Sequence, residues 1–243
     1  MTNSSRLPAP RAAMSSNAKV DLRLDWCSYQ AAKWAVEHWH YSRRMPKSKM
    51  VKIGVWEGSE FVGVIIFGVG ATDHLCKPYG LKNIQVCELT RIALKKHEVS
   101  VSRIVSIAIS FLKKQSPSLR LIVSFADTAY GHLGKIYQAG NWVFTGLTGN
   151  ATEYLFRGRW VHSRSIGNWS KKLGVVRTTL AQGTRKSSLK YRYVYPLDSA
   201  MRAQIAPLAK SYPKRGPGEI DSAPSPNSET GGASPTGPLL EST

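Results

Sequence analysis

The chain has 243 residues and a formal net charge of +19 at pH 7, which suits a polyanionic partner such as DNA, RNA or an anionic membrane surface. The sequence contains no apolar run of about 18 residues, so it predicts no helix that spans a bilayer. The three cysteines form no C-x-x-C pair, which argues against a structural zinc site and favours reduced thiols in a cytoplasmic protein.

Composition sets the bounds of the predicted domain. Residues 1–18 show no hydrophobic periodicity and are expected to form a flexible N-terminal arm. Residues 212–243 are dominated by Pro, Gly, Ser and Thr, which cannot bury a core, and are expected to form a disordered tail. Residues 19–211 are therefore predicted to form one domain.

The predicted elements of the first half are a helix and three strands. Residues 28–39 favour a helix with Ala31, Trp34, Ala35 and His38 on its inner face. Strands are predicted at 51–56, 61–69 and 84–94, because these segments are rich in Val, Ile and Phe and the first two are joined by a short turn.

The second half predicts further alternation of helices and strands. A helix begins at Ser100 or Ser102 and runs to about residue 115, with its inner face formed by Ile104, Ile107, Ala108 and Phe111. A strand at 119–125, a helix at 132–139 closed by Gly140 in the left-handed conformation, and strands at 142–147 and 191–195 complete the order. This order predicts an α/β fold with a central mixed sheet flanked by helices.

The strand ELTRIAL, the loop KKHEVS and the helix SRIVSIAISFLKK predict an anion-binding turn. Free N–H groups and the dipole at a helix N-terminus favour phosphate. Arg91, Ser102 and Arg103 are the candidate cofactor-binding residues. The loop lacks a glycine-rich fingerprint, and an ordinary helix start with solvated lysines is the alternative.

The segment SFADTAYGHLGKIYQAGNWVFTG places Asp127 at the end of a predicted strand and Tyr137 in the helix that follows. The ends of such strands commonly hold ligand-binding groups. The run IYQAGNWVFTG resembles the closing segment of the GCN5-related N-acetyltransferase fold, which carries a tyrosine near an acyl thioester. With ELTRIAL, this resemblance covers roughly residues 50–150, and the missing Gly-x-Gly in the cofactor loop is its departure.

The loop EHWHYSRRMP, residues 37–46, gathers histidine, tyrosine and arginine side chains. Imidazole, phenolate and carboxylate ligands suit iron, so this loop is a candidate iron site. The alternative is an ordinary helix end with half-buried aromatic residues, which would have the same composition.

Four motifs in this order, WHYSRRMP, ELTRIAL, SFADTAYGHLGKIYQAGNWVFTG and KYRYVYP, resemble the Mom family of phage Mu over residues 25–196. The resemblance implies an acetyltransferase-like enzyme that adds a methylcarbamoyl group to adenine N6 in phage DNA and shields that DNA from host restriction endonucleases. It further implies acetyl-CoA and iron as cofactors, action in the host cytoplasm, His40, Asp127 and Tyr137 as catalytic residues, and a metal set drawn from His40, Tyr41, Asp127 and Tyr137.

The product implied by the resemblance constrains the chemistry. Attack of an amine on the thioester carbonyl would yield an N6-acetyl group, whereas a methylcarbamoyl group is joined through its methylene carbon. A general base such as Asp127 cannot achieve that step alone, and a redox metal offers a radical route.

Residues 154–192 hold ten lysines and arginines and no aspartate or glutamate, with aromatic residues between them. Basic side chains neutralise phosphates and aromatic faces stack on bases, so this stretch is expected to bind double-stranded DNA. The candidate contacts are Arg157, Arg159, Arg164, Lys171, Lys172, Arg185 and Lys186.

Two other functions are compatible with parts of the sequence. A conventional acetyl-CoA-dependent N-acetyltransferase would share the fold, but the charge of +19 argues against it. A DNA-binding protein without catalytic activity would share the charge, but the grouping of His40, Tyr41, Asp127 and Tyr137 argues against it.

Overall fold

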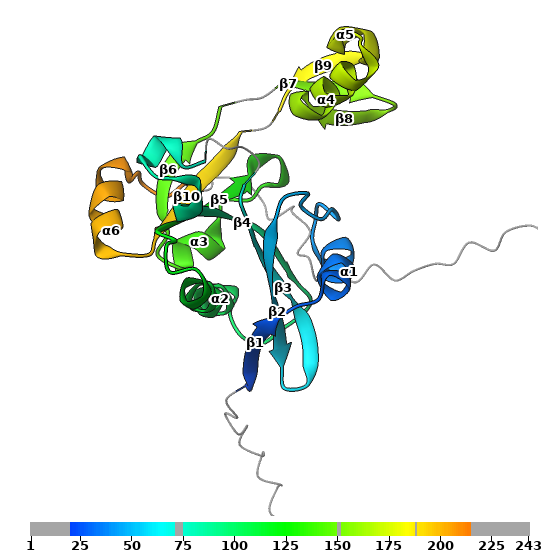
Figure 1. The fold of residues 1–243 in the computed structure, drawn as a ribbon. Helices are drawn as coiled ribbons and strands as arrows, with labels where there is room; N and C mark the ends of the chain where they lie inside the picture. The colour runs from blue at the N-terminus through cyan, green and yellow to red at the C-terminus, as the bar shows by residue number, and fades with distance from the viewer. Residues whose placement is uncertain (1–19, 71–74, 150–151, 188, 215–243) are drawn as a thin grey trace, which may run out of the picture.

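A computed structural model describes residues 20–70, 75–149, 152–187 and 189–214, with only the backbone of Arg164. The predicted arm at 1–18 and residues 215–243 of the predicted tail lie outside this range. Within it, the central element is a seven-stranded mixed sheet in the order β1-β2-β3-β4-β5-β10-β6 (Figure 1). Its strands are β1 Leu22–Trp26, β2 Met50–Glu57, β3 Glu60–Gly68, β4 Val86–Leu94, β5 Leu121–Asp127, β10 Lys190–Pro196 and β6 Val143–Leu147.

Helices cover both faces of this sheet, which confirms the predicted α/β class. The helices are α1 Tyr29–Trp39, α2 Val101–Gln115, α3 Lys135–Ala139 and α6 Ser199–Ile205. Four 3-10 turns join the elements: Lys77–Tyr79, Asn83–Gln85, Thr128–Tyr130 and Ala206–Leu208. Successive side chains along a strand point to opposite faces of the sheet, so each strand contributes to the core on both faces. Phe67, Ile122 and Tyr193 face α2 and α3, whereas Ile66 and Val64 pack against α1, and Val123 and Val194 pack against α6.

The inner faces of two helices differ from the predicted ones. In α1 the buried residues are Ala32, Ala35 and Val36, while Trp34 is half exposed and stacks on His38, with 4.3 Å between ring centroids. In α2 the buried residues are Ile104, Val105, Ala108, Ile109 and Leu112, so the inner face is rotated away from Ile107. Both sequences offer apolar residues on several sides of the helix, so their periodicity does not fix which side faces the core.

The turn after α3 also differs from the prediction. Gly140 has φ −92°, and the left-handed conformation is taken by the next residue, Asn141, with φ 57°. Asparagine tolerates this conformation better than most residues other than glycine. The Gly140 N–H bonds back to the carbonyls of Ile136 and Tyr137 and so still closes the helix.

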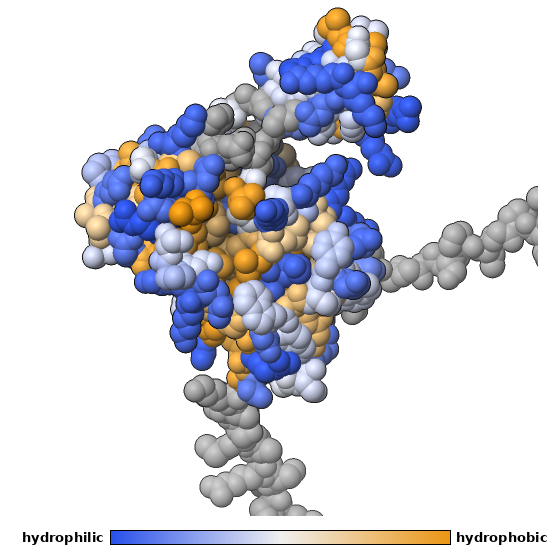
Figure 2. Space-filling view, in the orientation of Figure 1, coloured by the Kyte–Doolittle hydropathy of each residue, from blue (hydrophilic) through white to orange (hydrophobic). Residues whose placement is uncertain are grey.

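A second, smaller sheet was not predicted from the sequence. Strands β7 Thr152–Phe156, β8 Arg159–His162 and β9 Gly183–Lys186 pair in the order β8-β7-β9, and α4 Ser163–Leu173 and α5 Arg177–Leu180 complete the unit. Ile166 is fully buried in it, and the rings of Phe156 and Trp169 lie 4.9 Å apart. We call residues 152–186 the lobe. The lobe is inserted in the chain between β6 and β10 and projects from the main sheet (Figure 1). Its visible surface is largely hydrophilic (Figure 2).

Tyr212, placed at the start of the tail by composition, packs on the main sheet. Its hydroxyl donates to the Trp142 carbonyl over 2.7 Å, and its ring centroid lies 6.4 Å from that of Tyr193.

Candidate active site

The two parallel strands at the centre of the sheet separate soon after they meet. β4 and β5 pair only at Val86↔Leu121, Cys87↔Ile122 and Glu88↔Val123. Just beyond these pairs, Ser124 Oγ lies 2.8 Å from the Leu89 carbonyl oxygen and 2.7 Å from the Tyr137 hydroxyl. Burial raises the pKa of Tyr137 to about 12. Tyr137 is therefore a protonated phenol at neutral pH, held where the strands separate.

A β-bulge in β4 directs two charged side chains to one face of the sheet. Ile66 pairs with Arg91, but the next residue, Phe67, pairs with Leu89, so Thr90 is an extra residue in β4. A bulge of this kind reverses the alternation of side chains beyond it. Glu88 and Arg91 therefore share the face that packs against α1, and Glu88 opposes the effect of burial, which lowers the pKa of Arg91.

His40 follows the last turn of α1 and is buried. Its Nδ1 accepts the Ser42 backbone N–H at 3.1 Å and lies 2.8 Å from Ser42 Oγ. The backbone contact forms only when Nδ1 is unprotonated, so the neutral ring carries its proton on Nε2. Burial, together with the positive charges of Arg91 and His132, lowers the pKa of His40 to about 3. His40 is thus an uncharged hydrogen-bond donor at neutral pH.

Asp127 is the last residue of β5 and is 9% exposed. Its carboxylate accepts the Ala129 backbone N–H at 3.0 Å and pairs with Lys190 Nζ at 3.2 Å. Tyr41 is about half exposed, and the partial burial of its hydroxyl end raises its pKa, which the Asp127 charge raises further. Burial lowers the pKa of His132, and Asp127 opposes this change. Asp127, Tyr41 and His132 therefore share one electrostatic environment.

The structure brings the predicted catalytic residues together. His40, Tyr41, Arg91 and Asp127 interact electrostatically, and Tyr137 is near enough for Tyr41 to raise its pKa. Sequence reasoning missed five neighbours: Glu88, Ser124, Tyr130, His132 and Lys190. All five lie within or beside the motifs already noted, so their proximity to these motifs could have identified them as site residues.

The predicted cofactor-binding residues are not brought together. Arg91 faces α1, where its Nε donates to the Arg44 carbonyl at 3.1 Å. Ser102 and Arg103 lie in the first turn of α2, which packs against the opposite face of the sheet. Arg91 lies on the α1 face by ordinary alternation from Ala93, opposite to the α2 face, and the bulge at Thr90 adds Glu88 to the same face.

The carboxylate of Glu57 lies at the loop where the sequence predicts a bound phosphate. Glu57 accepts the backbone N–H of Glu98 at 3.0 Å and of Val99 at 2.9 Å, in the loop that precedes α2. These are N–H groups that a phosphate would use. Pyrophosphate therefore does not fit this loop unless Glu57 moves away.

The expected iron ligands do not form a coordination set as their side chains lie. Nε2 of His40 carries the ring proton, and the Tyr137 hydroxyl is buried against Ser124. In the described part of the chain, no three His, Cys, Asp or Glu side chains are grouped closely enough to hold a metal ion. Iron remains a prediction from the resemblance.

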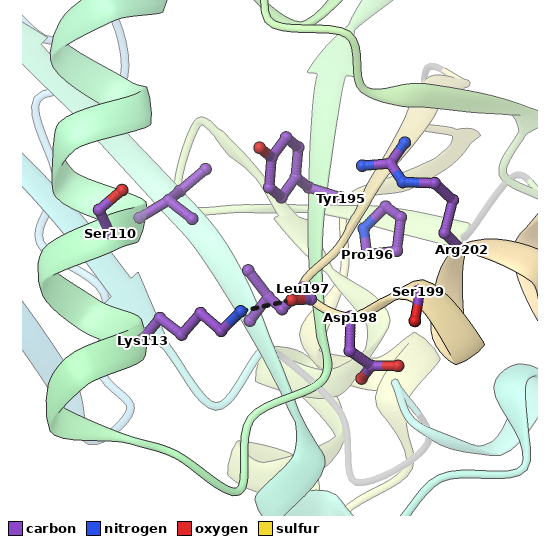
Figure 3. A pocket seen from close by; sticks show the side chains of 9 residues that line it. Ser110, Lys113, Tyr195, Pro196, Leu197, Asp198, Ser199 and Arg202 are labelled. Carbon is purple, nitrogen blue, oxygen red and sulfur yellow. Dashed lines mark hydrogen bonds between the residues drawn. The ribbon is translucent and has the colours of Figure 1, made fainter.

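A cleft of about 380 Å³ lies at the opposite end of β5 from Asp127 (Figure 3). Lys113 and Tyr195 line it, beside Asp198 and Arg202, and Lys113 Nζ donates to the Leu197 carbonyl at 2.7 Å. The cleft contains none of the predicted site residues.

The lobe carries the predicted DNA-binding residues, and the six with described side chains are exposed: Arg157, Arg159, Lys171, Lys172, Arg185 and Lys186. The side chain of Arg164 lies outside the described part of the structure. Arg185 pairs with Glu153 at 2.8 Å and stacks over Trp160 at 4.3 Å, so its charge is compensated. Glu153 immediately precedes the acid-free stretch, which is why composition missed this pair. None of the described helices is both long and apolar enough to cross a bilayer.

Comparisons with known proteins agree with the motif resemblance. The chain is 28% identical over 194 residues to "Methylcarbamoylase mom" of Escherichia phage Mu, which covers 76% of this chain and 79% of that protein. A probable GNAT-family acetyltransferase from Chromobacterium violaceum is 11% identical, with a TM-score of 0.43 over 81% of this chain and 96% of its own. A putative acetyltransferase from Acinetobacter baylyi is also 11% identical, with a TM-score of 0.42 over 74% and 94%.

The profile of the Mom protein family matches residues 21–214, which include the main sheet, the lobe and every predicted catalytic residue. This chain belongs to the Mom protein family.

Proposed function

We propose that this protein transfers a methylcarbamoyl group to adenine N6 in DNA and thereby protects that DNA from host restriction endonucleases. Membership of the Mom family and the name of the phage Mu relative support the reaction. The observation that carries the proposal is the convergence of His40, Tyr41, Asp127 and Tyr137, from separate motifs, on one electrostatic environment.

The chemistry of these residues fits substitution at an amine. When N6 bonds to the methylene carbon of the incoming group, that carbon's bond to its leaving group in the donor breaks, the leaving group departs with the bonding electrons, and the N6 amine releases a proton. Asp127 is the acceptor that we assign to this proton. Lys190 stabilises the carboxylate before the transfer. Burial raises the pKa of Tyr137 to about 12, so its phenol stays protonated and can donate a hydrogen bond at the site. His40 accepts the Ser42 N–H at Nδ1, which leaves the Nε2 proton of its neutral ring able to donate a hydrogen bond without a charge.

Acetyl-CoA and iron are the cofactors that the resemblance implies, and neither enters these roles. Calorimetric titration with acetyl-CoA tests the first, with Arg103→Ala as the informative variant. Metal analysis of protein purified from iron-supplemented cells tests the second, with His40→Ala and Asp127→Ala compared to wild type.

Nucleoside mass spectrometry of DNA from expressing cells tests the function. The wild type should yield deoxyadenosine that carries a carbamoylmethyl group, and Asp127→Asn and Tyr137→Phe should abolish it. Control variant Tyr29→Phe changes an exposed tyrosine outside the site. Unmodified DNA, or a lighter N6-acetyl product without the terminal carboxamide nitrogen, would contradict the proposal.

Resistance of the same DNA to endonucleases whose sites contain adenine tests the protective role. It should follow the amount of modified nucleoside across the variants.

A further inference from the structure

Three aromatic rings from two loops form a cluster beside Asp127. The ring centroid of Tyr41 lies 4.6 Å from that of Tyr130 and 5.0 Å from that of His132, and Tyr130 and His132 lie 6.0 Å apart. Tyr41 follows α1, whereas the other two follow β5, so folding brings them together from separate parts of the chain. We call Tyr41, Tyr130 and His132 the aromatic cluster.

The tyrosines of the aromatic cluster remain open to solvent. Tyr41 is 47% exposed and Tyr130 is 50% exposed, although aromatic rings gain free energy from burial. On its inner side the cluster adjoins His40, whose ring centroid lies 4.3 Å from that of Tyr41. Open ring faces next to buried polar groups are what a single unstacked base requires, since stacking binds the base and polar groups identify it.

The polar group beside the rings distinguishes adenine from guanine. The Asp127 carboxylate caps the turn Thr128–Tyr130 by accepting the Ala129 N–H at 3.0 Å, and the His132 N–H donates to the Asp127 carbonyl at 3.3 Å, so these contacts hold Asp127 next to Tyr130 and His132. Adenine presents an amino group at position 6, which donates to a carboxylate. Guanine held in the same orientation presents a carbonyl oxygen at position 6, which a carboxylate repels, and its N–H donors at positions 1 and 2 would meet Asp127 only if the base turned in the site. Cytosine also carries an amino group, but its single ring offers less area for stacking.

We infer that the aromatic cluster receives an adenine base that has swung out of the DNA substrate, with the rings stacking on the base and Asp127 accepting a hydrogen bond from N6. The inference rests on the proposed function, because it names how the substrate base is held. A base inside the duplex cannot reach Asp127, so extrusion has to precede binding here.

Fluorescence anisotropy with three labelled single-stranded oligothymidylates tests the inference. The strands differ only at one central position, which holds adenine, guanine or an abasic sugar. Stacking of one base adds roughly 5- to 150-fold in affinity, so the wild type should prefer adenine to the abasic strand by a factor in that range. It should also prefer adenine to guanine.

Variants assign this preference to the cluster. Tyr41→Ala and Tyr130→Ala should lose the preference for adenine over the abasic strand, and the corresponding Phe variants should keep it. Asp127→Asn should keep stacking but lose most of the discrimination against guanine. Tyr29→Ala is the matched control, because Tyr29 is also 50% exposed but lies outside the cluster. Thermal unfolding of each variant identifies any loss of folded protein.

The outcomes separate this inference from the proposed function. If the wild type modifies DNA but binds the adenine and abasic strands equally, or if the Ala variants keep the preference, the inference is overturned while the function stands. If the cluster-dependent preference is found but no N6 product forms, the proposed reaction is wrong and the adenine site remains.

Discussion

Exposed lysines of the lobe should account for part of the salt dependence of DNA binding. Lys171, Lys172 and Lys186 are exposed and have no ion-pair partner within the described structure. Each lysine that neutralises a duplex phosphate contributes about 0.9 to the slope of log affinity against log salt. Replacing all three by Ala should therefore flatten the slope by up to about 2.7, and Arg185→Ala should change it less, because Glu153 already compensates that charge.

The measurement is duplex binding at several salt concentrations, by anisotropy or filter retention. Lys77→Ala, Lys82→Ala and Lys114→Ala, combined, form the matched control: these lysines are exposed, lie outside the lobe and give the same change in net charge. The control should leave the slope near that of the wild type. Equal flattening by both triple variants would refute the reasoning, because net charge rather than the lobe would then set the slope.

Four further predictions concern Glu57, His40, residues 215–243 and Tyr212. Glu57→Ala should free the N–H groups of Glu98 and Val99 and tighten pyrophosphate binding measured by calorimetry, whereas unchanged affinity would show that this loop holds no phosphate. The folded-state pKa of His40 is about 3, below its ordinary value of 6.5, so the unfolded chain binds an extra proton between these pH values. The stability of the wild type relative to His40→Gln should therefore fall as the pH drops below about 6.5. A difference in melting temperature that stays constant with pH would contradict this prediction, and His38→Gln is the exposed control. Deleting residues 215–243 should leave the melting temperature nearly unchanged. Tyr212→Phe removes the hydrogen bond to the Trp142 carbonyl and should lower the unfolding free energy, measured by urea denaturation, by about 1 kcal/mol.

The sequence predicted those parts of the fold whose patterns arise from the core. β2, β3, β4, β5 and β6 lie close to their expected positions, because runs of Val, Ile and Phe are needed where both faces of a sheet are covered. The lobe was missed because its strands are short and polar, and among its described side chains Ile166 is the one hydrophobic group that is buried. The exposed face of α1 was assigned wrongly because Trp34 and His38 stack on each other outside the core.

The residues of the candidate site were predictable where they belong to recognisable motifs, but not where their position depends on tertiary structure. His40, Tyr41, Asp127 and Tyr137 follow from quoted motifs, and the structure gathers them. The shared face of Glu88 and Arg91 depends on a bulge at Thr90, where the pairing shifts by one residue, and no local sequence pattern predicts it. The bonds of Glu57 to a loop about forty residues away depend on tertiary packing, which single-sequence reasoning does not reach.

The attachment of the lobe has a consequence for how this enzyme is organised and can be re-engineered. The chain leaves the main sheet after β6 and returns in β10, where Leu147 pairs with Tyr191 and the Thr148 N–H bonds to the Lys190 carbonyl. The two points of exit and return are thus neighbours on adjacent antiparallel strands, the arrangement of a hairpin whose turn has been replaced by an inserted module. A short turn in place of residues 149–189 would close the same two strands, so the lobe can be removed or exchanged between relatives at this junction without interrupting the main sheet.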